Sequence, residues 1–240
     1  MLILKICEEL TEDEISLGVR RVPPVWGAKM GAADYFSQIA PSLTRGEDPL
    51  TPAELGCTLA HLECYSIILE EGRSALILED DMFLNVQTLQ AVKLLDEKGL
   101  EFVHLAQSAL YTFRGHAIDD NLYEIDPRKD FWGGAAYLLT PAFAQELKEF
   151  HTASIQLADA WADFFRNRAG DSPHYSPIFF HTGETSSIRS SRKMARKLSV
   201  KGLMKRRALQ WLERRTKHLQ DRVRGLASPI GRIPNTTDPR

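Results

Sequence analysis

Cysteines and long hydrophobic runs are scarce in this sequence of 240 residues. Its three cysteines, Cys7, Cys57 and Cys64, are too few for a disulfide framework and suit a reducing cytoplasm. No apolar run approaches the roughly 18–20 residues that a bilayer-spanning helix needs, and no basic segment precedes the apolar residues at the start. We therefore expect a cytoplasmic protein with neither a secretion signal nor a membrane span.

Several motifs that would identify a chemistry directly are also missing. The sequence has no glycine-rich phosphate loop, no Gly-x-Ser-x-Gly elbow, no His-Glu-x-x-His motif and no internal repeat. What is present is a composition of 43% hydrophobic and 26% charged residues, which excludes a collagen-like or wholly disordered chain. The length suits one α/β domain with an appendage.

Positive charge is concentrated at the end of the chain. Residues 189–240 contain 16 basic and three acidic residues, a net charge of +13, whereas residues 1–188 contain 14 basic and 29 acidic residues, a net charge of −15. We therefore predict a domain over residues 1–188 and a basic tail over residues 189–240. The acidic domain argues against nucleic acid as a partner, and the tail favours an anionic surface such as phospholipid headgroups.

Hydrophobic patterning predicts alternating strands and helices in residues 1–188. Strands are expected at residues 2–7, 74–78, 102–105, 135–139 and 178–180, and helices at 52–71, 86–98 and 141–150, with Thr140 as the N-cap of the last. Thr51, Pro52 and Glu54 form a capping box with a first-turn proline, and Gly72 is the expected end of that helix. For residues 8–50 we expect mixed structure that is rich in loops. This βα alternation predicts an α/β fold with a mostly parallel central sheet.

Three carboxylates, Glu79, Asp80 and Asp81, directly follow the short apolar run 74–78. Ligands of open α/β sheets bind at the carboxyl ends of strands, and Mg²⁺ or Mn²⁺ takes oxygen ligands shared with a substrate phosphate. Side chains two residues apart on an extended segment point the same way, so Glu79 and Asp81 could face a metal-bound diphosphate while Asp80 supports the loop. The alternative is an acidic loop in water.

Cys57, His61 and Cys64 share one face of the predicted helix 52–71 and resemble zinc ligands superficially. A single helix closes a tetrahedral site poorly, and no fourth cysteine or histidine is adjacent in sequence. We favour His61 as a hydrogen-bonding residue that anchors the helix beside the acidic strand end. The two cysteines are then small buried groups.

Two further positions could carry chemistry. Asp159 and Asp163 lie four residues apart in a predicted helix, so both would share one face, and either could act as a general base or be solvated. His181 follows the phenylalanine-rich strand 178–180 and could be a ligand, a phosphate contact or a surface histidine.

Three segments in order, residues 55–62 (LGCTLAHL), 75–81 (ALILEDD) and 132–140 (WGGAAYLLT), resemble glycosyltransferase family 25, which includes bacterial lipooligosaccharide galactosyltransferases. Residues 157–159 (LAD) and 186–188 (SSI) look like further family segments. Together the resemblance spans roughly residues 50–190.

The resemblance implies a GT-A nucleotide-sugar fold and inverting transfer of a hexose, galactose by preference, from a UDP-hexose donor to an oligosaccharide or glycolipid acceptor. It implies Asp159 as the base and a divalent cation, Mn²⁺ or Mg²⁺. The resemblance places the cation near Glu79, Asp80 and Asp81. We expect the donor to contact Glu79, Asp80, His61, Gly133 and Gly134, and the cation to bind Asp81, Glu79 and His181. The alternative is a non-catalytic, sugar- or lipid-binding relative.

The basic tail shows a helical apolar stripe among its lysines and arginines. The stripe runs through Met204, Ala208, Trp211, Leu219 and Val223. We expect residues 189–226 to hold the protein on the inner face of the cytoplasmic membrane. The alternative is that the stripe packs on the acidic domain or on the second subunit of a homodimer. The proline-containing end is expected to be disordered.

Overall fold

The computed structural model describes residues 1–181 except 109–114, 127–132, 167, 169 and 171. The predicted tail, the domain boundary at residue 188 and the segment 186–188 lie outside the described residues and stay predictions. The first half of the described chain contains β1 (Leu2–Ile6), α1 (Glu12–Ser16), β2 (Arg20–Val22), the 3₁₀ helix η1 (Gly27–Lys29), α2 (Ala32–Thr44), α3 (Pro52–Glu71), β3 (Ala75–Leu78) and α4 (Val86–Asp96). The second half contains β4 (Phe102–Ser108), β5 (Gly115–Asp119), β6 (Leu122–Ile125), β7 (Ala136–Leu139), α5 (Pro141–Ala153), α6 (Trp161–Arg166) and β8 (His174–His181).

The described strands form one eight-stranded sheet in the order β2-β1-β3-β7-β4-β8-β6-β5. Parallel pairing joins β1 to β2, β1 to β3 and β4 to β8, whereas the other four neighbouring pairs are antiparallel. The prediction of a mostly parallel sheet is therefore wrong, although the α/β class is confirmed. The reason is that β7 runs antiparallel between β3 and β4, and the β5–β6 hairpin adds two antiparallel strands at one edge.

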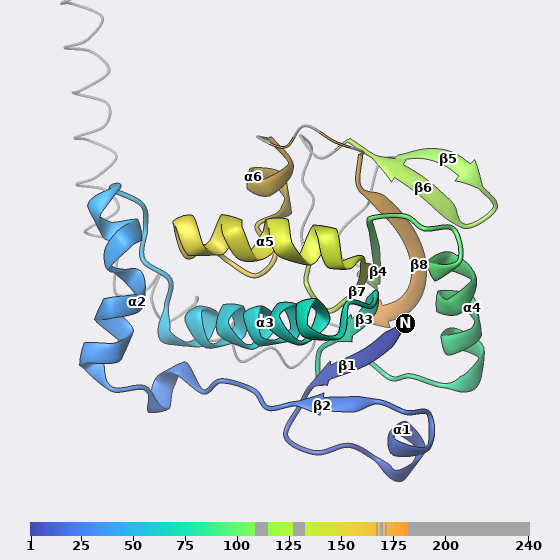
Figure 1. The fold of residues 1–240 in the computed structure, drawn as a ribbon, viewed down its shortest axis with the longest axis horizontal. Coiled ribbons are helices and arrows are strands. Elements are labelled where there is room, and N and C mark those ends of the chain that lie inside the picture. The colour runs from blue at the N-terminus through green and yellow to red at the C-terminus, as the bar shows by residue number, and fades with distance from the viewer. Residues whose placement is uncertain (109–114, 127–132, 167, 169, 171, 182–240) are drawn as a thin grey trace, which may run out of the picture. The chain divides into compact units, whose positions relative to one another are not determined.

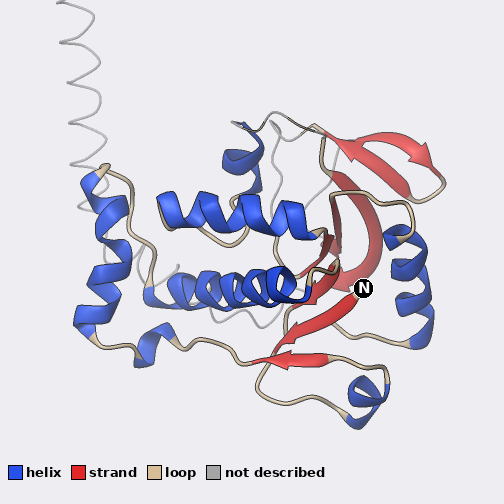
Figure 2. Cartoon of the chain, in the orientation of Figure 1, coloured by secondary structure: helices blue, strands red, loops and turns tan. Residues whose placement is uncertain are grey.

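Helices cover both faces of this sheet (Figures 1 and 2). The short strand β3 shows how, because its side chains alternate between two cores. Ala75 and Ile77 pack in a core with residues of α3, α5 and α6, whereas Leu76 and Leu78 pack in a second core with residues of α4. All four side chains are fully buried. Burial on both faces of the sheet explains why every residue of β3 is apolar. The apolar run ends at Leu78, and the next residue, Glu79, is half-buried.

The predicted caps of α3 are confirmed. The Thr51 side chain accepts from the Glu54 amide, the Glu54 carboxylate accepts from the Thr51 amide, and Pro52 opens the helix. Gly72 ends it in the left-handed conformation, with a φ of 61°. The strand expected at 2–7 and the helices expected at 86–98 and 141–150 also begin where predicted, and their last residues differ from the prediction by one to three positions.

Residues 8–50 contain more structure than the sequence predicted. The 13-residue helix α2 lies in this region, although Pro41 interrupts its pattern and no side chain caps its start at Gly31. Across the described residues, no helix combines the length and the hydrophobicity that a membrane span requires.

Candidate functional site

The acidic triplet occupies a turn that follows β3, so the extended segment from which a shared direction of Glu79 and Asp81 was predicted does not form. The Glu79 amide donates to the Ala135 carbonyl (2.8 Å), and the Glu79 carbonyl accepts from the Met82 amide (3.1 Å). The first bond holds the start of the triplet against the segment before β7, and the second closes the turn. Glu79 and Asp81 are half-buried, whereas Asp80 is exposed. A half-buried pair of carboxylates at a strand end can hold a hard cation while remaining open to a substrate.

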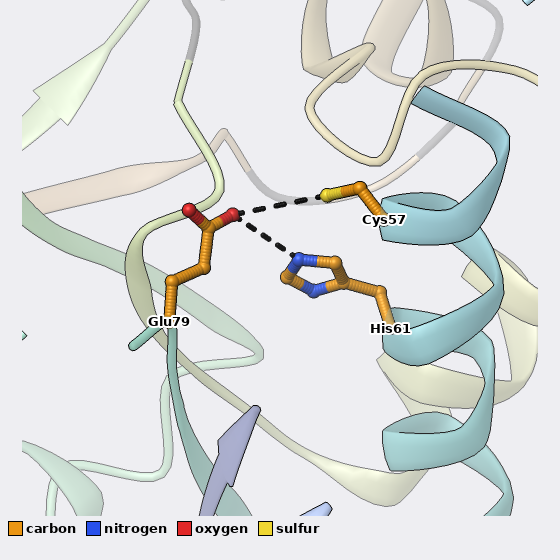
Figure 3. A group of neighbouring side chains, drawn as sticks. All are labelled: Cys57, His61 and Glu79. Atoms are coloured by element: carbon orange, nitrogen blue, oxygen red, sulfur yellow. Dashed lines mark hydrogen bonds and ion pairs between the residues drawn. The ribbon is translucent and has the colours of Figure 1, made fainter. Parts of the chain in front are cut away.

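Helix α3 brings two side chains to Glu79. His61 Nε2 lies 3.3 Å from Glu79 Oε1, and Cys57 Sγ lies 4.0 Å from the same oxygen (Figure 3). Cys57 and His61 are one helical turn apart and therefore share a face. His61 is buried, and the side chain of Glu79 is 29% exposed. The helix thus presents a thiol and an imidazole to one oxygen of the carboxylate.

Close backbone packing holds the start of α3 in this position. A Cβ on Gly56 would lie 2.1 Å from the Val25 carbonyl oxygen, and one on Gly27 would lie 1.6 Å from the Pro52 carbonyl oxygen. Both contacts are too short for any side chain. Glycine at these two positions therefore lets the helix carrying Cys57 and His61 sit directly against residues 25–27.

A buried hydrogen-bond chain fixes the imidazole of His61. Its Nδ1 lies 2.6 Å from the hydroxyl of Tyr137 in β7, and that hydroxyl lies 3.1 Å from the hydroxyl of Tyr65 in α3. Burial raises the pKa of both tyrosines well above the ordinary value, so both keep their protons. Each hydroxyl can donate and accept, so the chain serves either tautomer of His61.

Gly133 and Gly134 connect this group to Asp159. The Gly133 amide donates to Asp159 Oδ2 (3.2 Å), and the Gly133 carbonyl accepts from Trp161 Nε1 (2.8 Å). Gly133 has a φ of 104°, which favours glycine. On the other side, a Cβ on Gly134 would lie 3.5 Å from Glu79 Oε1. The two glycines therefore pass between the carboxylates of Glu79 and Asp159.

His104 supports the same turn from β4. Its Nε2 donates to the Gly133 carbonyl across 2.7 Å. Burial lowers the pKa of His104 to about 4, so the ring is neutral near pH 7. A neutral imidazole that donates from Nε2 fixes the carbonyl without adding charge beside the two carboxylates.

The sequence matches the family model for glycosyltransferase family 25 (LPS biosynthesis protein) over residues 32–161, more than half of the chain. The chain belongs to glycosyltransferase family 25. No curated protein matches the sequence. Family membership supports a glycosyltransferase of lipopolysaccharide (LPS) biosynthesis that acts on a sugar donor and a sugar acceptor.

The family match contains most of the residues that the sequence singled out. The structure brings together Glu79, His61, Gly133, Gly134 and Asp159, and all five lie within residues 32–161. Asp80 and Asp81 follow Glu79 in the same turn. His181 ends β8, beside Ser108 in the sheet register, but its side chain lies outside what the structure describes.

The prediction that Asp159 and Asp163 share a helical face is wrong. Helix α6 begins at Trp161, so Asp159 lies in the turn that precedes it. Asp163 lies on α6, is 56% exposed and pairs with Arg166 on the same helix across 2.7 Å. Only Asp159 therefore reaches the Gly133–Gly134 segment.

Cys57, His61 and Cys64 do not form a zinc site, because Cys64 is not among the side chains whose ligand atoms lie together. Cys64 is fully buried in the core beneath α3, and burial raises the pKa of its thiol. Sequence reasoning missed the partner that does lie beside Cys57, which is Glu79, and it missed Tyr137. A tyrosine in the middle of a fully buried apolar strand was the available signal, because a buried hydroxyl needs a hydrogen-bond partner.

Proposed function

We propose that this family 25 glycosyltransferase moves a hexose, galactose by preference, from a UDP-sugar to a lipooligosaccharide or LPS acceptor with inversion at the anomeric carbon. One observation carries the proposal: Gly133 and Gly134 join the acidic end of β3 to Asp159. A carboxylate that can take a proton therefore lies near carboxylates that can hold a metal-bound diphosphate. Such a pairing suits transfer of a sugar from a nucleotide to a hydroxyl.

Asp159 is the proposed general base. Its carboxylate would take the proton of the acceptor hydroxyl as that oxygen bonds to the anomeric carbon of the donor. The bond from the anomeric carbon to the UDP oxygen breaks with its electron pair on UDP. Inversion follows when the hydroxyl attacks the face opposite to UDP. The hydrogen bond from the Gly133 amide holds one oxygen of Asp159 in a fixed direction for this step.

Asp81 and Glu79 are the proposed protein ligands of the donor cation, with His181 as a third. The half-buried carboxylate residues Glu79 and Asp81 suit Mn²⁺ or Mg²⁺, which commonly binds through one or two carboxylates together with substrate phosphates. When bound, the cation would neutralise the charge that builds on the departing UDP. Asp80, His61, Gly133 and Gly134 would line the donor side of the site.

The sheet around β3 supports a GT-A-type nucleotide-sugar fold. Strands β1 and β3 are parallel neighbours, so their carboxyl ends lie side by side. Glu79 directly follows β3 at this end of the strands. Ligands of such sheets bind outside the carboxyl ends of the strands. We place the UDP-hexose at the carboxyl ends of β1 and β3.

The basic tail favours a reaction at the membrane surface. Residues 189–240 carry a net charge of +13, and the sequence favours contact of residues 189–226 with an anionic membrane. The enzyme would then lie peripherally on the inner face of the cytoplasmic membrane, next to a lipid-linked acceptor. Packing of the tail on a second subunit is the competing outcome.

UDP release with and without Mn²⁺ tests the proposed function. Purified protein is incubated with UDP-galactose and other UDP-hexoses, with and without a soluble oligosaccharide acceptor. We expect metal-dependent release of UDP that increases with acceptor and is largest with UDP-galactose. Binding of UDP-hexoses without UDP release under any condition would instead indicate a non-catalytic relative.

A further inference from the structure

Cys57, His61 and Glu79 form a compact group of metal-ligating side chains. Their ligand atoms, Sγ, Nε2 and Oε1, lie within 4.8 Å of one another, and no other such group of three occurs in the part of the chain that the structure describes. Figure 3 shows the thiol and the imidazole converging on one oxygen of Glu79, while its second oxygen points away from both. The group mixes sulfur, nitrogen and oxygen, unlike the oxygen-only triplet after β3.

We propose that Cys57, His61 and Glu79 form a binding site for Zn²⁺, separate from the donor cation. Tetrahedral zinc takes bonds of about 2.3 Å to sulfur, about 2.0–2.1 Å to nitrogen and about 2.0–2.2 Å to oxygen, which place neighbouring ligand atoms about 3.3–3.6 Å apart. The observed Nε2–Oε1 separation is 3.3 Å, and the Sγ–Oε1 separation is 4.0 Å. Binding of the ion requires the Cys57 side chain to turn so that Sγ lies about 0.4 Å closer to Glu79 Oε1.

The charges of the three ligands also suit zinc. A Cys57 thiolate and the Glu79 carboxylate together neutralise the two charges of the ion, and neutral His61 adds none. A thiolate favours Zn²⁺ over Mn²⁺ or Mg²⁺, which prefer oxygen. The zinc site therefore differs from the proposed donor site in the metal that it selects, and Glu79 offers each ion a different oxygen.

The buried surroundings orient His61 for this role. Zinc-bound histidines usually donate their other ring N–H to a fixed acceptor. Here His61 Nδ1 lies 2.6 Å from the Tyr137 hydroxyl, which can accept from it and donate in turn to Tyr65. When Nδ1 donates to Tyr137, the lone pair is on Nε2, which is the ring nitrogen that lies 3.3 Å from Glu79 Oε1.

Gly134 lies against two members of the group. A Cβ at this position would lie 3.5 Å from Glu79 Oε1 and 3.6 Å from His61 Cε1, so any side chain here would be in contact with both. Cys57 and Glu79 are only half-buried, which gives an ion a route from solvent. Three protein ligands with an open fourth position are typical of zinc sites that bind water or a substrate atom.

Cobalt substitution tests the site without any sugar nucleotide, so its outcome does not depend on transferase activity. The full-length protein is stripped with a chelator and titrated with Co²⁺. We expect one equivalent to give a near-ultraviolet thiolate-to-cobalt charge-transfer band that Zn²⁺ abolishes by displacement and that excess Mn²⁺ leaves unchanged. The absence of this band in the wild-type protein would refute the site.

Cysteine variants identify the ligand. Cys57→Ser should remove the band and lower zinc affinity by more than about 100-fold, because loss of an outer hydrogen-bond partner alone costs 10–100-fold. Cys64→Ser and Cys7→Ser are the matched controls, since both thiols are buried elsewhere, and both variants should keep the band. Circular dichroism confirms the fold of each variant. A band that survives Cys57→Ser, or that disappears in a folded control, overturns the assignment.

Tyr137→Phe tests the orientation of His61. This variant should keep the cobalt band, because the three ligands remain, while zinc affinity falls by about 10–100-fold. An unchanged affinity contradicts the role given to the tyrosine chain.

Discussion

The amide of Gly133 donates a hydrogen bond to Oδ2 of Asp159 across 3.2 Å. This bond joins the turn before α6 to the segment before β7, and the next glycine lies against Glu79. The carbonyl of Gly133 is held in turn by Trp161 and His104. Asp159 is therefore positioned by buried groups from two different elements, as a residue that must meet a substrate in one geometry needs to be.

The first prediction concerns the donor cation. Asp81→Asn should leave the melting temperature nearly unchanged, because the change is almost isosteric in a turn, yet remove Mn²⁺-dependent binding of UDP. A carboxamide lacks the charge that a hard cation needs. Asp120→Asn, an exposed site in the β5–β6 turn, is the matched control and should bind UDP normally. Equal UDP affinity in Asp81→Asn and the wild-type protein, measured by calorimetry with Mn²⁺, would remove Asp81 from the site.

The second prediction concerns the buried tyrosine chain. Tyr137→Phe should lower the free energy of unfolding by about 1–3 kcal/mol, because it leaves His61 Nδ1 and the Tyr65 hydroxyl without their shared partner. Tyr123→Phe, a half-buried tyrosine of β6, should change it by less than about 0.5 kcal/mol. Urea titration measures both values, and similar losses in the two variants would argue against the chain.

The third prediction is a pH dependence of stability. Burial lowers the pKa of His151 in α5 to about 4. The unfolded chain binds a proton at this residue near its usual pKa of about 6.5, so between about pH 6.5 and pH 4 the unfolded state holds more protons than the folded state. Acidification through this window therefore destabilises the fold, by up to about 1.4 kcal/mol per pH unit for this histidine.

Replacing the histidine isolates this contribution. His151→Gln should flatten the decline of stability between about pH 6.5 and pH 4, whereas replacement of the exposed His116 by glutamine should leave it unchanged. Urea titrations at several pH values give the two slopes. If the slopes of wild-type and His151→Gln proteins coincide, His151 is not buried in its neutral form.

The fourth prediction concerns the basic tail. A chain that ends after Ser191 should stay folded and use a soluble acceptor, but it should no longer sediment with anionic vesicles. The full-length protein should sediment with them at low salt and be released as salt rises, because screening weakens the attraction. Precipitation or a much lower melting temperature of the shortened chain would instead place the tail in the domain core or in a dimer interface.

Helix α3 and strand β3 could be predicted from the sequence because their signals are local. Thr51, Glu54 and Gly72 mark the ends of α3, and an apolar run followed by Glu79 marks β3. Sheet direction is not a local property. The apolar runs of β3 and β7 look alike, and only tertiary packing makes β7 antiparallel.

The sequence predicts which residues belong to the site better than it predicts which of them contact one another. The sequence pattern singles out Glu79 and His61, the family resemblance singles out Asp159, and the structure brings all three to the Gly133–Gly134 segment. The contact between Cys57 and Glu79 joins residues 22 positions apart, which no local pattern specifies. The spacing of four between Asp159 and Asp163 predicts one helical turn, but α6 begins only at Trp161.

Turnover by Asp159→Asn, measured beside Asp163→Asn, tests the central claim most directly. With the UDP-hexose that the wild-type protein uses, Asp159→Asn should lower kcat by on the order of 10²–10⁴ while donor affinity stays nearly unchanged. Asp163→Asn should have a milder effect, because its carboxylate is exposed and pairs only with Arg166 among the described residues. Equal losses in the two variants, or a loss in Asp163→Asn alone, would contradict the assignment of Asp159 as the base.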